Sequence, residues 1–141
     1  MVQVKEKSIE AGKKPIAHGV GRRKNAVARV WLRRGNGTVM INKQAVDKYF
    51  DTSIEVDAAQ TPMRLVSSSA HYAIEANVKG GGKKAQADAV KLAIARSFIA
   101  FDESLRPLLK EHGLLTVDDR VKERKKYGQR AARRKFQFVK R

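Results

Sequence analysis

The stretch that decides the fold is NAVARVWLRR, residues 25–34, because its side chains alternate with a period of two. Alternation of this kind predicts a half-buried β-strand, with one face against a core and the other facing outward. The apolar face would hold Ala26, Ala28, Val30 and Leu32, and the opposite face Val27, Arg29, Trp31 and Arg33. The Asn-Gly pair of GNG, residues 35–37, is favoured in tight hairpin turns, and TVMIN follows it. We therefore predict a β-hairpin with residues 38–42 as its return strand.

A second alternating stretch, HYAIEANVK at residues 71–79, predicts another strand. It leads through three glycines into a helical pattern over residues 83–101. The buried stripe of that helix is predicted at Val90, Ile94, Phe98 and Phe101, with Ala87 and Ala95 allowing close approach to the sheet. The fragment ESLRPLLKEHG predicts a second, short helix that stops at Gly113.

The remaining segments are less regular. Residues 42–50 predict a turn and one short helical stretch, and Pro62 is expected to exclude a regular helix through its position. Strands mixed with one long and one short helix predict a two-layer α+β domain. We expect a flexible lead-in at residues 1–15, a globular domain at residues 16–117, and a long extended basic tail at residues 118–141.

The charge is the most informative feature of the composition. The 141 residues include 31 Lys and Arg against 14 Asp and Glu, for a net charge of +17. The last 22 residues hold 11 basic residues and one acid, Glu123, for a net charge of +10. A chain this basic repels itself unless a polyanion neutralises it, so we expect nucleic acid as its partner and an anionic membrane only as a weaker alternative.

The sequence offers little for catalysis. It contains no cysteine, and its three histidines have no metal-ligand spacing. A phosphate loop of the form GxxxxGK[ST] ending at Lys83 would need glycine at 77 and serine or threonine at 84, where the chain has Asn77 and Lys84. We therefore predict no catalytic residue, no metal and no cofactor. No apolar run approaches the length of a membrane helix and no signal peptide is evident, so we expect a cytoplasmic protein that does not bind membranes.

Three basic clusters are candidate nucleic-acid contacts. The first, around GRRK, places Arg22, Arg23 and Lys24 just before the strand that carries Arg29 and Arg33. The second is Gly80–Gly82 with Lys83 and Lys84, which suits either a phosphate at a helix N-terminus or a plain flexible connection with two solvated lysines. The third is the tail, which holds two basic runs, RVKERKKYGQR at residues 120–130 and RAARRKFQFVKR at residues 130–141. There, Phe136 and Phe138 would stack on unpaired bases or, alternatively, pack on the protein's own body or a neighbour.

Several blocks, in this order and spacing, resemble the bacterial form of the small-subunit ribosomal protein nine family. The blocks are GRRKNAVARV, NVKGGG, IARSF, LRPLLKEHGLLTVDDRVKERKKYG and ARRKFQFVKR, and the resemblance covers residues 16–141. It implies the fold of the second domain of small-subunit ribosomal protein five, with a left-handed βαβ crossover. It also implies a structural role in the head of the small ribosomal subunit, bound to ribosomal RNA and beside other head proteins. The tail would reach the transfer RNA in the peptidyl site.

The residues expected to contact RNA combine the three clusters with this resemblance. Those expected to bind ribosomal RNA are Arg22, Arg23, Lys24, Arg29, Arg33, Gly80, Gly81, Gly82, Lys83, Lys84, Arg120, Lys122, Arg124, Lys125, Lys126, Arg130, Arg133, Arg134 and Lys135. Those expected to reach transfer RNA are Phe138, Lys140 and Arg141.

The chain departs from the family pattern at several positions. Lys135-Phe136 stands where the family usually has Arg-Pro, Val139 replaces a serine, and Asn25 replaces a threonine. Lys83, Lys84 and Ala85 replace a less basic stretch. From another class, a DNA-compacting protein would use the same charge, but a single basic tail and the absence of a helix zipper disfavour it. Competition between DNA and RNA would discriminate the two functions.

Overall fold

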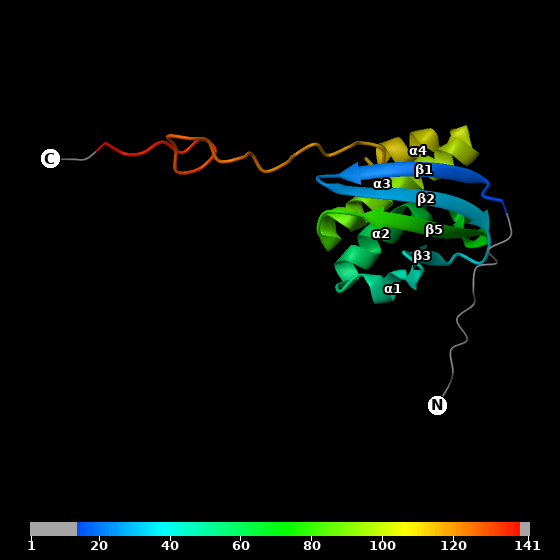
Figure 1. The fold of residues 1–141 in the computed structure, drawn as a ribbon. Coiled ribbons are helices and arrows are strands. Elements are labelled where there is room, and N and C mark those ends of the chain that lie inside the picture. Colours follow the sequence, from blue (N-terminus) through cyan, green and yellow to red (C-terminus); the bar gives the residue numbers. More distant parts are fainter. Residues whose placement is uncertain (1–13, 139–141) are drawn as a thin grey trace, which may run out of the picture.

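Within residues 14–138, which the computed structural model describes, a five-stranded sheet with strand order β1-β2-β5-β3-β4 carries helices on one face (Figure 1). The strands are β1 (Ala17–Arg23), β2 (Ala26–Arg34), β3 (Val39–Ile41), β4 (Gln44–Ala45) and β5 (Tyr72–Lys79). The helices are α1 (Val46–Tyr49), α2 (Ser53–Leu65), α3 (Lys83–Phe101) and α4 (Arg106–Glu111). Two 3-10 turns, Ser67–His71 and Glu103–Leu105, connect them. The predicted α+β class is confirmed.

The predicted hairpin between residues 26–34 and 38–42 is wrong. Strand β5 lies between β2 and β3, pairing antiparallel with β2 and parallel with β3. The loop after β2 is tied to the start of β5, since the amide of Gly35 donates to the carbonyl of His71 and that of Gly37 to the carbonyl of Tyr72. A local turn motif carries no information about a strand that arrives more than thirty residues later, which is why the pattern misled.

Strand β1 was not predicted, because glycine occupies its buried positions. Gly19 and Gly21 face helix α3, and a Cβ built on either would lie 2.2 Å from the carbonyl oxygen of Ala93 or 2.0 Å from that of Ala89, respectively. No side chain fits between the backbones, so the strand shows no apolar alternation. Arg22 and Arg23 therefore lie inside β1 rather than ahead of the first strand.

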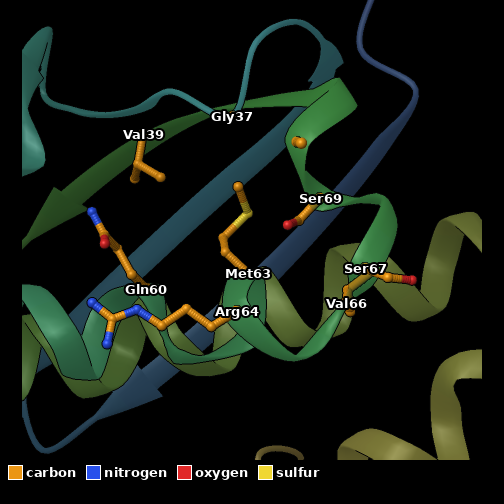
Figure 2. A pocket seen from close by; sticks show the side chains of 9 residues that line it. Gly37, Val39, Gln60, Met63, Arg64, Val66, Ser67 and Ser69 are labelled. Carbon is orange, nitrogen blue, oxygen red and sulfur yellow. The ribbon is translucent and has the colours of Figure 1, made fainter.

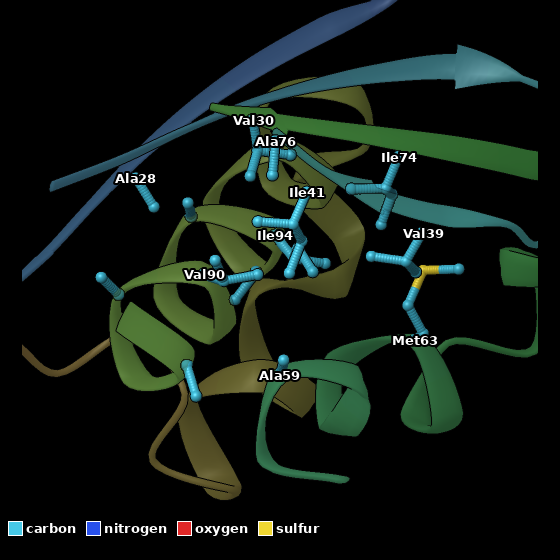
Figure 3. Packing of buried hydrophobic residues seen from close by; sticks show 14 of the residues in the cluster. Ala28, Val30, Val39, Ile41, Ala59, Met63, Ile74, Ala76, Val90 and Ile94 are labelled. Atoms are coloured by element: carbon cyan, nitrogen blue, oxygen red, sulfur yellow. The ribbon is translucent and has the colours of Figure 1, made fainter. Parts of the chain in front are cut away.

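The alternation predicted for the two central strands is confirmed. Ala26, Ala28, Val30 and Leu32 of β2 are fully buried, and Ile74, Ala76 and Val78 of β5 lie beside them. Figure 3 shows these strands above the helices, with Val90 and Ile94 of α3 beneath Val30, Ile41 and Ala76. Each fully buried valine, leucine or isoleucine of this core contributes roughly 1.5–3 kcal/mol to folding.

Two helix predictions need correction. Helix α2 runs through Pro62, so the expectation that this proline excludes a regular helix is wrong. The proline forfeits the hydrogen bond that an amide there would donate to the carbonyl of Ala58, and burial of its ring in the core offsets part of that loss. Helix α3 covers the predicted residues, but Phe101 at its end is 44% exposed and contacts the ring of Tyr72 instead of lying in the core. The short helix α4 ends as predicted, with Gly113 at a φ of 65°.

The chain beyond α4 leaves the domain. Leu114 is still buried, whereas residues from Val117 onward lie on or beyond the surface, and Figure 1 shows this segment running away from the sheet past the tip of the β1–β2 hairpin. We call residues 118–138 the tail; residues 139–141 lie outside the described part, as do residues 1–13 of the predicted lead-in.

Candidate nucleic-acid interface

The face of the sheet opposite α2 and α3 bears most of the predicted strand cations. Alternation sends Arg29, Trp31 and Arg33 of β2 outward, away from the buried Val30 and Leu32. The register places Arg22 of β1 and Lys79 of β5 beside Val27, so both exposed cations flank the start of β2. We call this surface the open face. Lys79 was missed as a candidate, although its position on the polar side of the alternation was a usable signal.

The open face also holds an aromatic pair and one ion pair. His18 and Trp31 are cross-strand neighbours whose ring centroids lie 5.5 Å apart. Arg33 donates through Nε to Glu75 Oε2 at 3.1 Å, so its charge is partly neutralised. Arg29 is exposed and pairs in register with Val20 and Asn77, neither of which is acidic. Arg29 is therefore better placed than Arg33 to contact a phosphate.

The β1–β2 turn and the triple glycine, which are far apart in the sequence, lie against each other. Gly80 and Gly81 have φ values of 74° and 66°, in the region that side chains disfavour. A Cβ at Gly80 would lie 2.4 Å from the carbonyl oxygen of Asn25, and one at Gly81 3.0 Å from the Ala26 amide nitrogen. These glycines therefore let the chain pass close to the turn that carries the exposed Lys24. The first two basic clusters thus lie together at one end of the domain, which we call the basic end.

The two lysines after the glycines have different surroundings. Lys83 Nζ donates to the carbonyl of Tyr49 and lies 3.9 Å from the centroid of its ring, which turns this side chain toward α1. Lys84 is exposed at the first turn of the 19-residue helix α3, where amide donors and the helix dipole favour an anion. Of the two, Lys84 is the better candidate for a phosphate contact.

Consecutive arginines of the GRRK motif lie on opposite sides of the sheet. Arg22 is exposed on the open face, whereas Arg23 points to the helix side, where its Nε lies 3.8 Å from Asp88 Oδ2 of α3. Its remaining donors go to the tail: Nη1 to the carbonyls of Asp118 and Arg120, and Nη2 to the Asp118 carboxylate. Arg23 thus brings the third basic cluster to the same end of the domain as the first two.

The tail is not extended throughout. Gln129 and Lys135 form an antiparallel bridge, the amide of Arg130 donates to the carbonyl of Arg134 at 2.8 Å, and Gly128 turns the chain with a φ of 67°. Figure 1 shows the resulting loop in orange. Arg133 pairs with Glu123, and this guanidinium lowers the pKa of the Glu123 carboxyl. The loop shortens the reach expected of a fully extended chain.

Most of the tail cations and both of its phenylalanine rings are exposed. Phe136 is 59% exposed with the Arg130 guanidinium 5.6 Å from its ring centroid, and Phe138 is 96% exposed. Packing of these rings on the protein's own body is therefore not seen. Exposed basic side chains follow one another along this segment at Lys122, Arg124, Lys125, Lys126, Arg130, Arg134 and Lys135. Lys140 and Arg141 lie outside the described residues.

A family model described as ribosomal protein S9/S16 matches residues 21–141, which include the basic residues of the open face, the three glycines at 80–82 and the tail. The chain belongs to the ribosomal protein S9/S16 family. It is 48% identical over 124 residues to the small ribosomal subunit protein uS9 of Thermus thermophilus, covering 88% of this chain and 97% of that one. It is 46% identical over 126 residues to the uS9 protein of Amoebophilus asiaticus, covering 89% and 98%, respectively.

These relatives confirm the resemblance to bacterial members of the S9 family, and membership confirms that the chain is not an enzyme. The described part of this S9 family chain holds no helix long and apolar enough to cross a membrane. Nor does it gather three or more potential metal ligands in one place.

One open pocket of about 360 Å³ lies away from the basic end of this S9 family domain. Figure 2 shows it between the loop at Gly37, the end of α2 at Met63 and Arg64, and the turn carrying Ser67 and Ser69. Arg64 pairs there with Asp57. None of the predicted RNA-contacting residues lines this pocket, so it is separate from the candidate interface.

Proposed function

We propose that this chain is a structural constituent of the small ribosomal subunit, working in the cytoplasm, that binds ribosomal RNA in the subunit head. The observation that carries the proposal is the convergence of the three basic clusters at one end of the domain, through the β1–β2 turn, Gly80–Gly82 and the root of the tail. Clustered cations release counterions from RNA when they meet its phosphates, which makes binding favourable and strongly dependent on salt.

In this proposal the domain and tail have separate tasks. The open face and the basic end bind ribosomal RNA, chiefly through Arg22, Lys24, Arg29, Lys79 and Lys84, with Trp31 and His18 offering ring surfaces to unpaired bases. The tail cations between 120 and 135 thread between phosphates. Phe138, Lys140 and Arg141 then reach the transfer RNA in the peptidyl site. Other proteins of the subunit head are expected as neighbours.

We also propose the finer features of the fold and the domain limits. Strands β3 and β5 are parallel neighbours joined through α1 and α2, which supports a βαβ crossover. That this crossover is left-handed, as in the second domain of small-subunit ribosomal protein five, is what the family resemblance implies. We divide the chain into a lead-in at residues 1–15, a domain at 16–117 and a tail at 118–141. The burial of Leu114 and the exposure of most residues between 116 and 138 support the boundary between domain and tail.

Ultraviolet cross-linking in growing cells, with sequencing of the attached RNA, tests the proposal. We expect the domain to cross-link to small-subunit ribosomal RNA and the last residues to transfer RNA. Deleting Lys140 and Arg141 should spare assembly of the subunit while weakening peptidyl-site transfer RNA, whereas a deletion starting at Gly128 should also weaken binding to ribosomal RNA. Scattered DNA or messenger fragments without a ribosomal peak would overturn the proposal.

A further inference from the structure

We propose that Arg23 is a positioning residue, which sets the direction in which the basic tail leaves the domain by clamping residues 118–120 to the end of strand β1. The effect of this clamp on transfer RNA rests on the proposed function, but the clamp itself can be tested on the free protein. Arg23 was expected to bind RNA phosphates. The structure assigns it to the tail instead.

We call residues 118–120 the tail root. Arg23 contacts both the backbone and a side chain of this segment. Its Nη1 donates to the carbonyl oxygens of Asp118 and Arg120, each at 2.9 Å, and its Nη2 lies 2.8 Å from Asp118 Oδ2. The two carbonyls belong to residues two apart, so one guanidinium determines the course of the chain between them. A lysine, with a single ammonium centre, cannot span the three acceptors in this way.

Arg23 is itself held firmly. Its backbone pairs in register with Ala26 in the β1–β2 hairpin, and its Nε faces Asp88 of α3, whose other oxygen lies 3.4 Å from Lys91 Nζ. The Arg23 side chain is only 13% exposed. Its carboxylate partners on Asp88 and Asp118 are 33% and 32% exposed, so both contacts are partly shielded from water and interact more strongly than a fully exposed surface pair.

Asp118 makes the tail root rigid from the other side. Its Oδ1 accepts the backbone N–H of Arg120 at 3.0 Å, and its two oxygens accept Nε and Nη2 of the Arg120 guanidinium at 3.0 and 2.7 Å. The carboxylate therefore lies between two guanidiniums, one from the strand and one from the tail. Residues 118–120 become a stiff joint although they belong to no helix or strand.

A stiff joint at this place has a large effect at the far end of the tail. The 18 residues that follow Arg120, up to Phe138, would span at most roughly 60 Å if fully extended. The loop between Gln129 and Lys135 shortens this reach, so a change of about 20° at the joint would move Phe138 by up to roughly 20 Å. Without the clamp the root would sample a broad range of directions, as a flexible linker does. The clamp therefore narrows the volume that the tail must search before it meets RNA.

Pulsed electron paramagnetic resonance gives the distribution of distances between two spin labels, and it can therefore test the clamp in the full-length protein. The chain has no cysteine, so labels can be placed by Asp51→Cys in the domain and Val121→Cys just beyond the joint. We expect Arg23→Gln to roughly double the width of the 51–121 distance distribution. Arg23→Lys should broaden it to an intermediate degree. Arg22→Gln is the matched control, because it removes the same charge from the neighbouring, outward-facing residue. This variant should leave the 51–121 distance distribution unchanged.

A second label pair separates loss of the clamp from damage to the fold. Labels at Asp51→Cys and Glu111→Cys lie within the domain, and their distance should stay unchanged in Arg23→Gln. If the 51–111 distance distribution also broadens, the test of the clamp is Asp118→Asn. This substitution removes the ion pair from the tail side without altering a strand. An unchanged 51–121 distribution in Asp118→Asn, or in Arg23→Gln with an intact domain, would overturn the clamp.

Binding measurements then distinguish this inference from the proposed function. In salt titrations with small-subunit ribosomal RNA, Arg22→Gln should reduce the slope of log K against log salt by about 0.7–0.9, and Arg23→Gln should leave it unchanged. In reconstituted small subunits, Arg23→Gln should weaken peptidyl-site transfer RNA. A broadened 51–121 distance distribution with unaltered transfer RNA affinity would overturn the functional consequence of the clamp. The deletion of Lys140 and Arg141 tests the proposed function independently.

Discussion

Gly21 of strand β1 lies so close to Ala89 of helix α3 that a Cβ built on the glycine would be 2.0 Å from the alanine carbonyl oxygen. The contact joins two backbones, neither of which is free to move as a flexible side chain would be. The close approach brings the backbone of β1 against the long helix, so that Arg23 contacts α3 while Arg22 projects from the opposite face of the sheet. The candidate interface thus depends on a position that has no side chain.

Gly21→Ala should destabilise the domain. The added methyl group forces the strand and the helix apart, and overpacking of this kind costs about 1–3 kcal/mol, with the backbone contact placing this site at the upper end. Gly82→Ala is the control, since nothing lies within 4 Å of a Cβ there and its φ of −99° suits any residue. Urea unfolding of both variants measures the difference. Equal stability of the two would contradict the packing described between β1 and α3.

The two phenylalanines at the end of α3 should respond differently to truncation. Phe98 is fully buried and Phe101 is 44% exposed. Phe98→Ala should therefore reduce the free energy of unfolding by about 3–5 kcal/mol, the range for a large cavity in a core. Phe101→Ala should cost clearly less. Thermal or urea denaturation of the pair tests this, and a larger loss for Phe101→Ala would mean that Phe101 belongs to the core.

Arg29 should contribute one phosphate contact on the open face. Arg29→Gln is expected to lower the slope of log K against log salt for small-subunit ribosomal RNA by about 0.7–0.9. The control is Arg64→Gln, which removes an exposed arginine beside the pocket, where it pairs with Asp57. Filter binding at several salt concentrations measures both slopes. An equal effect of the two substitutions would indicate attraction by net charge alone, without a defined open-face contact.

The clamp should be insensitive to pH across the range from 8 to 5. Hydrogen bonds from the side chain and the backbone N–H of Arg120, with a further contribution from Arg23, hold the pKa of Asp118 well below its ordinary value of 3.8. Because this pKa is lowered on folding, the carboxylate's contribution is fully present above 3.8 and is lost only as the pH falls through the lower, folded value.

The spin-label pair at residues 51 and 121 measures this pH dependence. We expect the same distance distribution at pH 8 and at pH 5, since the lowered pKa keeps Asp118 ionised throughout. Asp88 of α3 is the other acid that faces Arg23. Broadening between pH 8 and pH 5 in the unsubstituted chain would show that the joint depends on a group with a higher pKa.

The strands at residues 26–34 and 72–79 and the helix at 83–101 could be predicted because their patterns are local. Each buries one face, and that requirement leaves a period of 2 or 3.6 in the sequence. Strand β1 could not be predicted, since Gly19 and Gly21 remove the side chains from which a period is read. The hairpin was mispredicted because an Asn-Gly pair describes a turn and not the strand that later pairs alongside it.

The sequence by itself determined the charge of the chain, the elements with clear periodicity, and the family to which it belongs. Each of these can be read from residue types and their order along the chain, without knowing which distant residues meet in space. Only the tertiary structure decided which cations share a surface. Alternation in β1 sends Arg22 to the open face and Arg23 to the helix side, and Arg23 meets Asp118 across 95 residues of sequence. The physical reason is that strand pairing and helix packing bring together residues that are distant in the sequence. The periodicity of a local stretch does not show which distant residues it will contact.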